Sequence, residues 1–320
     1  MVRSQACAGY PLRSGLAQGL DWEWGGSPEY RSMRFLQKNE KPLFQIFTLG
    51  ILVFILYYSV IVDLVHDWII DENYSHGFLI PLVSAFFIWR NRNRLREKQK
   101  KPYGVGLIIF VFGLLMFIIS HIGAEYFTMR LSLLVVIGGL LLYLGGKEIA
   151  AGLLFPLFYL VFMIPVPYVL YYSASFPLEL LASRWTSDLV SLLGIPILRD
   201  GNILHLENTT LQVVDACSGL RSLISLSALA AALAYVTQRT VAKGALLFLA
   251  AAPVAIGANI LRLSITAVLA SLYGEKVAQG FLHRFSGVVV FVFAVVSLCF
   301  IGGFLRWLSF KRDTGSSLAF

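Results

Sequence analysis

The sequence predicts an all-α polytopic membrane protein with about eight transmembrane helices and a small extracytoplasmic segment, a helix plus a β-hairpin, before the sixth span. Of its 320 residues, 58% are hydrophobic and 14% are charged, whereas soluble globular proteins have roughly 45–50% and about 25%. The apolar residues lie in blocks that approach the ~20 residues a helix needs to cross a bilayer. The short alternating segments that are typical of outer-membrane barrels do not occur.

The apolar blocks define the expected spans. They are residues 43–62, 77–90, 104–122, 127–144, 149–165, 217–236, 244–272 and 285–305. The second block is short and the fifth ends in Ile164-Pro165-Val166-Pro167, so counts of seven or nine stay open. We expect a disordered cytoplasmic leader over residues 1–42, with Met33 as an alternative start, a transmembrane domain over 43–310 and a cytoplasmic tail over 311–320.

Lysine and arginine predict the orientation, because cytoplasmic loops are enriched in them. Nineteen basic residues fall on one side of the membrane, seven of them in 90–101, and five fall on the other side. Both termini are therefore expected in the cytoplasm, with segment 166–216 outside. The net charge of +8 follows from this topology, so we do not expect nucleic acid as a partner.

The outer segment 166–216 contains two expected elements. Residues 176–193 form an amphipathic helix on the membrane interface, whose helical spacing aligns Phe176, Leu180, Ser183, Ser187 and Val190. After the turn at Asp200-Gly201, residues 202–206 and 210–214 form a β-hairpin. This hairpin leads the chain directly to Cys217.

Cys217 opens the sixth span and is the first candidate for chemistry, since polar groups within spans are expensive and often functional. Ser218 follows it. Arg221 lies four residues after Cys217, which places Cys217 and Arg221 on one helix face. A nearby cation and a helix N-terminus lower the pKa of a thiol and favour the thiolate. The alternatives are a buried cysteine that acts as a small hydrophobe and an arginine that extends to the interface.

Two further spans place polar groups at a similar outer depth. Arg262 lies in the seventh span, and Asn259 shares its helix face three residues earlier. His283 begins the eighth span, and Gly287 leaves space beside its ring one turn later. Each residue also has a structural alternative to a catalytic role. Arg262 could serve only to pack one helix against another, and His283 could serve only as a polar cap.

Cys217, Arg262 and His283 together meet the minimum for acyl transfer. A thiol nucleophile needs a base near neutral pH, which histidine provides. The oxyanion of the intermediate needs a donor, which arginine provides. His76, at the outer mouth of the second span, either binds substrate or caps that span. The histidines and acidic residues lack metal-ligand spacing, and we expect neither a metal nor a cofactor.

Five short motifs in this order resemble the exosortase/archaeosortase family over about residues 43–310. They are Asn73-Tyr74-Ser75-His76-Gly77-Phe78-Leu79-Ile80-Pro81, Gly201-Asn202-Ile203, Ala216-Cys217-Ser218-Gly219-Leu220-Arg221-Ser222-Leu223, Asn259-Ile260-Leu261-Arg262 and His283-Arg284-Phe285-Ser286-Gly287. The resemblance implies a membrane-embedded cysteine transpeptidase or endopeptidase, with Cys217, Arg262 and His283 as its triad. Its implied partners are secreted proteins that end in a short Pro-Glu-Pro-type signal, a transmembrane helix and a basic tail. A glycan or lipid acceptor, such as an exopolysaccharide or a membrane lipid, is implied in the same way.

Two other classes of protein compete with this interpretation. In a transporter, Arg221 and Arg262 would line a path for an anionic substrate, but the inner halves of the last three spans are almost wholly apolar. In a non-catalytic factor for exopolysaccharide or surface assembly, replacement of Cys217 by serine or alanine would be tolerated. An enzyme that uses the thiol would not tolerate it.

Overall fold

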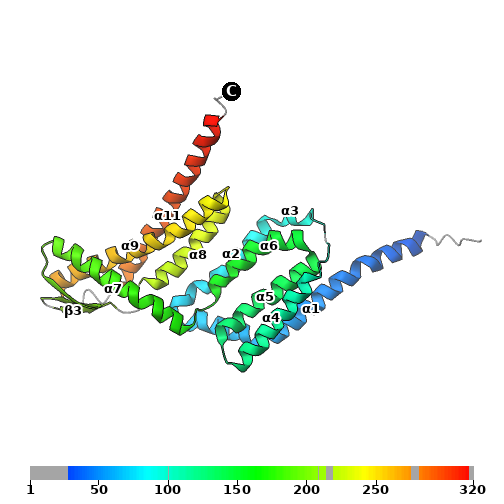
Figure 1. The fold of residues 1–320 in the computed structure, drawn as a ribbon, viewed down its shortest axis with the longest axis horizontal. Coiled ribbons are helices and arrows are strands. Elements are labelled where there is room, and N and C mark those ends of the chain that lie inside the picture. The colour runs from blue at the N-terminus through cyan, green and yellow to red at the C-terminus, as the bar shows by residue number, and fades with distance from the viewer. Residues whose placement is uncertain (1–27, 100, 208, 214–218, 275–280, 317–320) are drawn as a thin grey trace, which may run out of the picture. The chain divides into compact units, whose positions relative to one another are not determined.

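The computed structural model describes residues 28–316 apart from 100, 208, 214–218 and 275–280 (Figure 1). The chain divides into two compact units, residues 1–55 and 56–320. The described part of the first unit belongs to helix α1 (Pro28–Ile70). This helix begins upstream of the first expected span and runs through the expected boundary at residues 42 and 43.

Helices make up most of the second unit. After α1 they are η1 (Glu72–Phe78, a 3₁₀ helix), α2 (Leu79–Arg90), α3 (Arg92–Arg96), α4 (Val105–Ile122), α5 (Tyr126–Gly145), α6 (Lys147–Tyr159), η2 (Leu160–Met163, also 3₁₀), α7 (Tyr168–Leu192), α8 (Leu220–Thr237), α9 (Val241–Tyr273) and α11 (Phe281–Ser316). The all-α class is therefore confirmed.

The candidate spans of the described residues agree roughly with the expected count of about eight, of which seven was an open alternative. In the described part of the chain, six helices are long and apolar enough to cross a membrane, or up to seven if α6–η2 and α7 form one bent span. Helix α2 has 12 residues, about 18 Å at 1.5 Å per residue, which is short for a bilayer. Helices α6–η2 and α7 are bent by 79°, because Pro165 and Pro167 interrupt helical hydrogen bonding between them.

Helix α8 lies between two apolar cores and thereby positions the site. One of its faces places Ala228 and Ala231 against side chains of α1, η1, α2 and α6. Its other face places Leu226 and Ala230 against α9 and α11, which lie beside it in Figure 1. The small alanine side chains let neighbouring helices approach closely, as in many membrane bundles.

The expected hairpin is part of a larger antiparallel sheet. Strands β2 (Ile203–Leu206) and β3 (Thr209–Gln212) pair as expected, with Leu206 opposite Thr209. The sequence interpretation missed β1 (Ile197–Asp200), which pairs with β2 across the turn at Gly201-Asn202. The sheet packs on α7 and α9.

The expected helix over residues 176–193 is longer, and its buried face coincides only in part with the expected one. Helix α7 begins at Tyr168, and Phe176, one of the residues aligned by the sequence pattern, is 54% exposed. Ser183 and Val190 of that pattern are buried, and the buried stripe also contains the polar side chains of Ser175, Glu179 and Thr186. This face contacts the sheet and α9, where polar groups find hydrogen-bond partners that lipid does not offer.

Candidate active site

Gly219 fixes the start of α8 against α9. It precedes the first helical residue with φ +82°, in the left-handed region that glycine adopts without strain. A Cβ atom at Gly219 would lie 3.0 Å from the Cβ, Cγ and Nδ2 atoms of Asn259, which is buried. The chain two residues after Cys217 therefore packs directly on Asn259. Cys217 and Ser218 themselves lie outside the described residues.

Arg262 lies where three helices meet. It is one turn beyond Asn259 on α9 and lines a narrow cavity of about 20 Å³ together with Ser222 of α8 and Gly287 of α11. A Cβ atom at Gly287 would be 3.8 Å from the Cζ of Arg262, so this glycine leaves the guanidinium room. A cavity of this size has room for about one water molecule. The structure thus brings Gly287 of α11 to Asn259 and Arg262 of α9, a contact between helices that helix spacing did not predict.

His283 lies in the first turn of α11, four residues before Gly287. At 1.5 Å per residue, its Cα is about 6 Å further along the helix axis than that of Gly287. Helix α11 packs against both α8 and α9. The structure therefore brings the helices that carry Arg262 and His283 together, and the catalytic roles of Cys217, Arg262 and His283 stay predictions.

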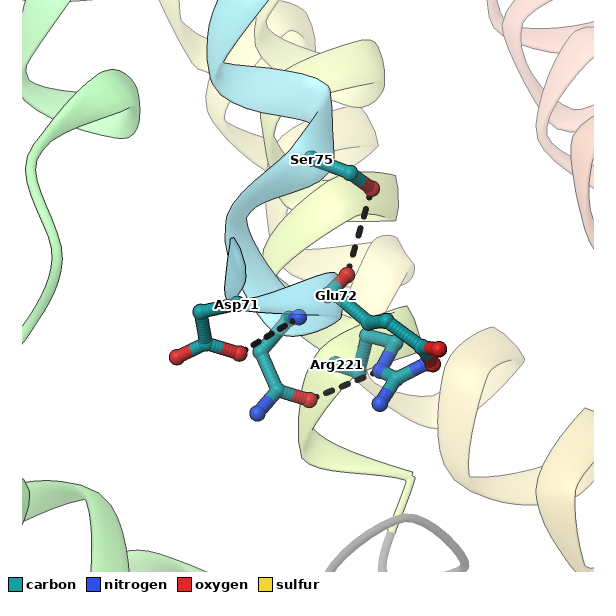
Figure 2. Close-up of polar contacts among 5 residues, drawn as sticks. Asp71, Glu72, Ser75 and Arg221 are labelled. Carbon is teal, nitrogen blue, oxygen red and sulfur yellow. Dashed lines mark hydrogen bonds and ion pairs between the residues drawn. The ribbon is translucent and has the colours of Figure 1, made fainter. Parts of the chain in front are cut away.

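Arg221 points from α8 toward η1, not toward the cavity that Arg262 lines. Its Nε donates to Asn73 Oδ1 at 2.7 Å, and its guanidinium forms an ion pair with Glu72 Oε2 at 3.1 Å (Figure 2). Asp71 caps η1 by accepting from the backbone N–H of Asn73, which orients the partner of Arg221. Since the Glu72 side chain is 83% exposed, its ion pair contributes at most about 1 kcal/mol.

His76 joins η1 to α8 one turn further along. Its Nδ1 lies 3.4 Å from the Oγ of Ser225, in a half-buried position. Burial lowers the pKa of His76 below its ordinary value, and backbone hydrogen bonds with Phe162 and Asn73 act in the opposite direction. The positional role of His76 and its contact with substrate both stay predictions.

A larger cavity of about 540 Å³ is lined by residues of α1, the start of α5 and the link between η2 and α7. It is lined by acidic residues and Arg130, including the 2.6 Å ion pair of Arg130 with Asp67. The hydroxyl of Tyr74 in η1 accepts a hydrogen bond from the N–H of the lining residue Val166. Within the described residues, no group of three or more histidines, cysteines or carboxylates could hold a metal ion.

The sequence interpretation missed Glu179, a carboxylate on α7 that is only 5% exposed. Its oxygens accept from Ser175 Oγ at 3.1 Å and from Asn202 Nδ2 at 3.2 Å. The signal was present in the sequence, because Ser175, Glu179 and Ser183 are spaced by four residues. It becomes visible only when residues 168–192 are assigned to one helix with a polar buried face.

Comparison with protein families gave one assignment. The family described as transmembrane exosortase matches residues 68–300, which is more than half of the chain. The matched region includes η1, the sheet, α8, α9 and most of the apolar part of α11. No match was found among curated proteins or among solved structures.

Proposed function

Because the chain belongs to the transmembrane exosortase family, we propose that it is a membrane-embedded cysteine transpeptidase or endopeptidase. It cleaves C-terminal sorting signals of secreted proteins at the outer face of the inner membrane. The observation that supports this best is the meeting of α8, α9 and α11 at Arg262. Gly219, two residues after Cys217 in the sequence, packs on Asn259, which lies one helical turn before Arg262.

The proposed reaction has two steps, in which Cys217 forms and then breaks a bond to the substrate. Its thiolate attacks the peptide carbonyl carbon while Arg262 donates hydrogen bonds to the oxyanion. His283 gives a proton to the leaving amine, so the C–N bond breaks and a thioester forms. His283 then takes a proton from water or from an acceptor, which displaces the Cys217 thiolate.

The proposed substrate carries a short motif, a transmembrane helix and a basic tail, and a glycan or lipid is the acceptor. Arg221 is the proposed partner for an acidic residue of the motif. In the free protein Arg221 pairs with Glu72, which is exposed. An acidic substrate side chain can replace Glu72 at little cost, because an exposed ion pair is weak.

The decisive experiment traps the covalent intermediate. A substrate fragment should remain attached to the wild-type protein as a thioester that hydroxylamine releases, and should not attach to the Cys217→Ala variant. Cys299→Ala is the matched control, since Cys299 is an exposed cysteine in the middle of α11, away from Arg262. If Cys217→Ala still processes substrate at normal protein levels, the enzyme proposal fails and the assembly-factor alternative takes its place.

A further inference from the structure

A groove of about 460 Å³ lies between α4, α5 and α6, on different helices from the candidate active site. Its lining residues are apolar or glycine apart from Lys147, the first residue of α6. Leu154 and Phe158, which line it from α6, are 65% and 61% exposed. The groove is therefore open on the outside of these helices, and an exposed apolar surface of this kind is typical of contact with a membrane.

Small residues on two helices leave this space open. Ala150 and Ala151 line it from α6, and Gly138 lines it from α5, where a Cβ atom would be 3.0 Å from the side chain of Leu157. Along α6 the groove extends from Lys147 to Phe158, which is about 17 Å at 1.5 Å per residue. This length is close to half of the ~30 Å hydrocarbon core, the depth of one leaflet.

Lysines gather at one end of the groove. The Nζ of Lys147 lies 4.0 Å from the centre of the Tyr103 ring. The Nζ of Lys98 donates to the carbonyl oxygen of Glu148 at 2.8 Å, in the first turn of α6. The backbone of Lys101 packs against the residue before α6. The acidic side chain of Glu148 is exposed among these lysines, so positive charge is in excess at this end.

We propose that the groove binds an anionic phospholipid, with one acyl chain between α5 and α6 and the phosphate at Lys147. The apolar lining and the length of one leaflet match an acyl chain. The positive end of the groove complements a phosphate, as basic sites between membrane helices do. The Lys147 ammonium has three donors, so it can bind a phosphate oxygen while the Tyr103 ring covers one side.

A transmembrane helix matches the groove less well than an acyl chain. A helix is about 10–12 Å across, so a piece as long as the groove occupies about 1,300 Å³ or more, which exceeds the volume of the groove. The inference does not depend on the proposed function. The bound lipid is also distinct from a lipid acceptor, because the acceptor must reach the site on α8, α9 and α11.

Two substitutions separate the head group from the chain. Lys147→Gln should lower the preference for phosphatidylglycerol over phosphatidylcholine by about fivefold, the usual effect of one lysine on an anionic lipid, and Lys147→Arg should keep it. Ala151→Phe should fill the groove and exclude the chains of both lipids. The matched controls are Arg239→Gln and Ala242→Phe, at exposed positions that do not line the groove.

The test uses the full-length protein in phosphatidylcholine nanodiscs that contain a small fraction of either lipid with a diazirine in its acyl chain. After irradiation, mass spectrometry of peptides measures cross-links within residues 131–161, at matched amounts of monodisperse protein. In wild type, we expect phosphatidylglycerol to cross-link at least about fivefold more than phosphatidylcholine. In Lys147→Gln the two lipids should become nearly equal, and in Ala151→Phe both should lose most of their cross-links.

Three results would overturn the inference. Equal cross-linking of the two lipids to wild type, or an unchanged ratio in Lys147→Gln, would show that the lysine does not select the head group. Unchanged yields in Ala151→Phe would place the acyl chain elsewhere. Absence of cross-links from either lipid within residues 131–161 would show that a protein surface, such as a second copy of the chain, covers the groove. The measurement needs no substrate, so its outcome is separate from that of the Cys217→Ala test.

Discussion

Gly219 carries two constraints at a single residue, and they can be separated. Its φ of +82° strains any other side chain, and Asn259 occupies the space that a Cβ atom needs. Gly194 has nearly the same φ, +80°, but no atom within 4 Å of its virtual Cβ. It is therefore a control for backbone strain without crowding.

We expect Gly219→Ala to reduce processing strongly and Gly194→Ala to reduce only stability, by about 1 kcal/mol of backbone strain. The crowded alanine must displace either Asn259 or the start of α8, and both border the proposed site. Processing rates and thermal unfolding in detergent would be measured for the two variants. Equal effects of the two substitutions on processing would show that contact with Asn259 has no functional consequence.

Arg262 is expected to act through the geometry of its guanidinium. Lysine keeps the charge but is a point donor on a flexible stem and cannot reproduce a planar fork of N–H groups. We expect Arg262→Lys to lower the processing rate by about 10²–10³, the usual loss when one oxyanion donor is removed. Arg199→Lys, on the exposed β1, is the control. Near-normal processing by Arg262→Lys would show that Arg262 acts only through its positive charge.

At the scale of elements, η1 is joined to α8 by Arg221 and His76. Burial lowers the pKa of His76 in the folded protein below its ordinary 6.5. Between the lowered value and about 6.5 the unfolded chain binds more protons than the folded protein, so the free energy of unfolding decreases as pH falls through this window. Above that window both states carry a neutral imidazole, and the contribution is constant.

We therefore expect thermal stability in detergent to fall from pH 7.5 to pH 5, and to fall less in His76→Gln, which has no group that titrates there. His205→Gln is the control, since His205 is exposed on β2. Melting temperatures at a series of pH values check the prediction. An identical pH dependence in His76→Gln and wild type would contradict it.

For the whole molecule, the distribution of basic residues predicts the orientation in the membrane. We expect residues 95 and 320 in the cytoplasm and residue 205, on β2, outside. Fusions of reporters that are active on only one side of the membrane, made at these three positions, measure this directly. Cytoplasmic activity at residue 205 would place the sheet, and with it the entrance to α8, on the wrong side for secreted substrates.

Much of the fold could be predicted because its patterns are local. Apolar blocks identified the long helices α4, α5, α8 and α9, and alternation with turn residues identified the pair β2 and β3. Strand β1 and the true length of α7 were missed, because a four-residue strand and a helix with a polar buried face give weak signals in sequence. The sequence interpretation counted α2 as a membrane span because its residues are apolar. The helix is nevertheless shorter than a span, with 12 residues.

For the site, helix spacing alone placed Asn259 and Arg262 on one face and His283 one turn from Gly287, since these relations depend on 3.6 residues per turn. The sequence by itself also determined the membrane class, through composition and block length. Only the tertiary structure decided that α8, α9 and α11 meet at Arg262, that Arg221 turns away to η1, and that Glu179 holds Asn202. Those contacts join residues far apart in the chain, and the packing of whole helices, which no local pattern encodes, brings them together.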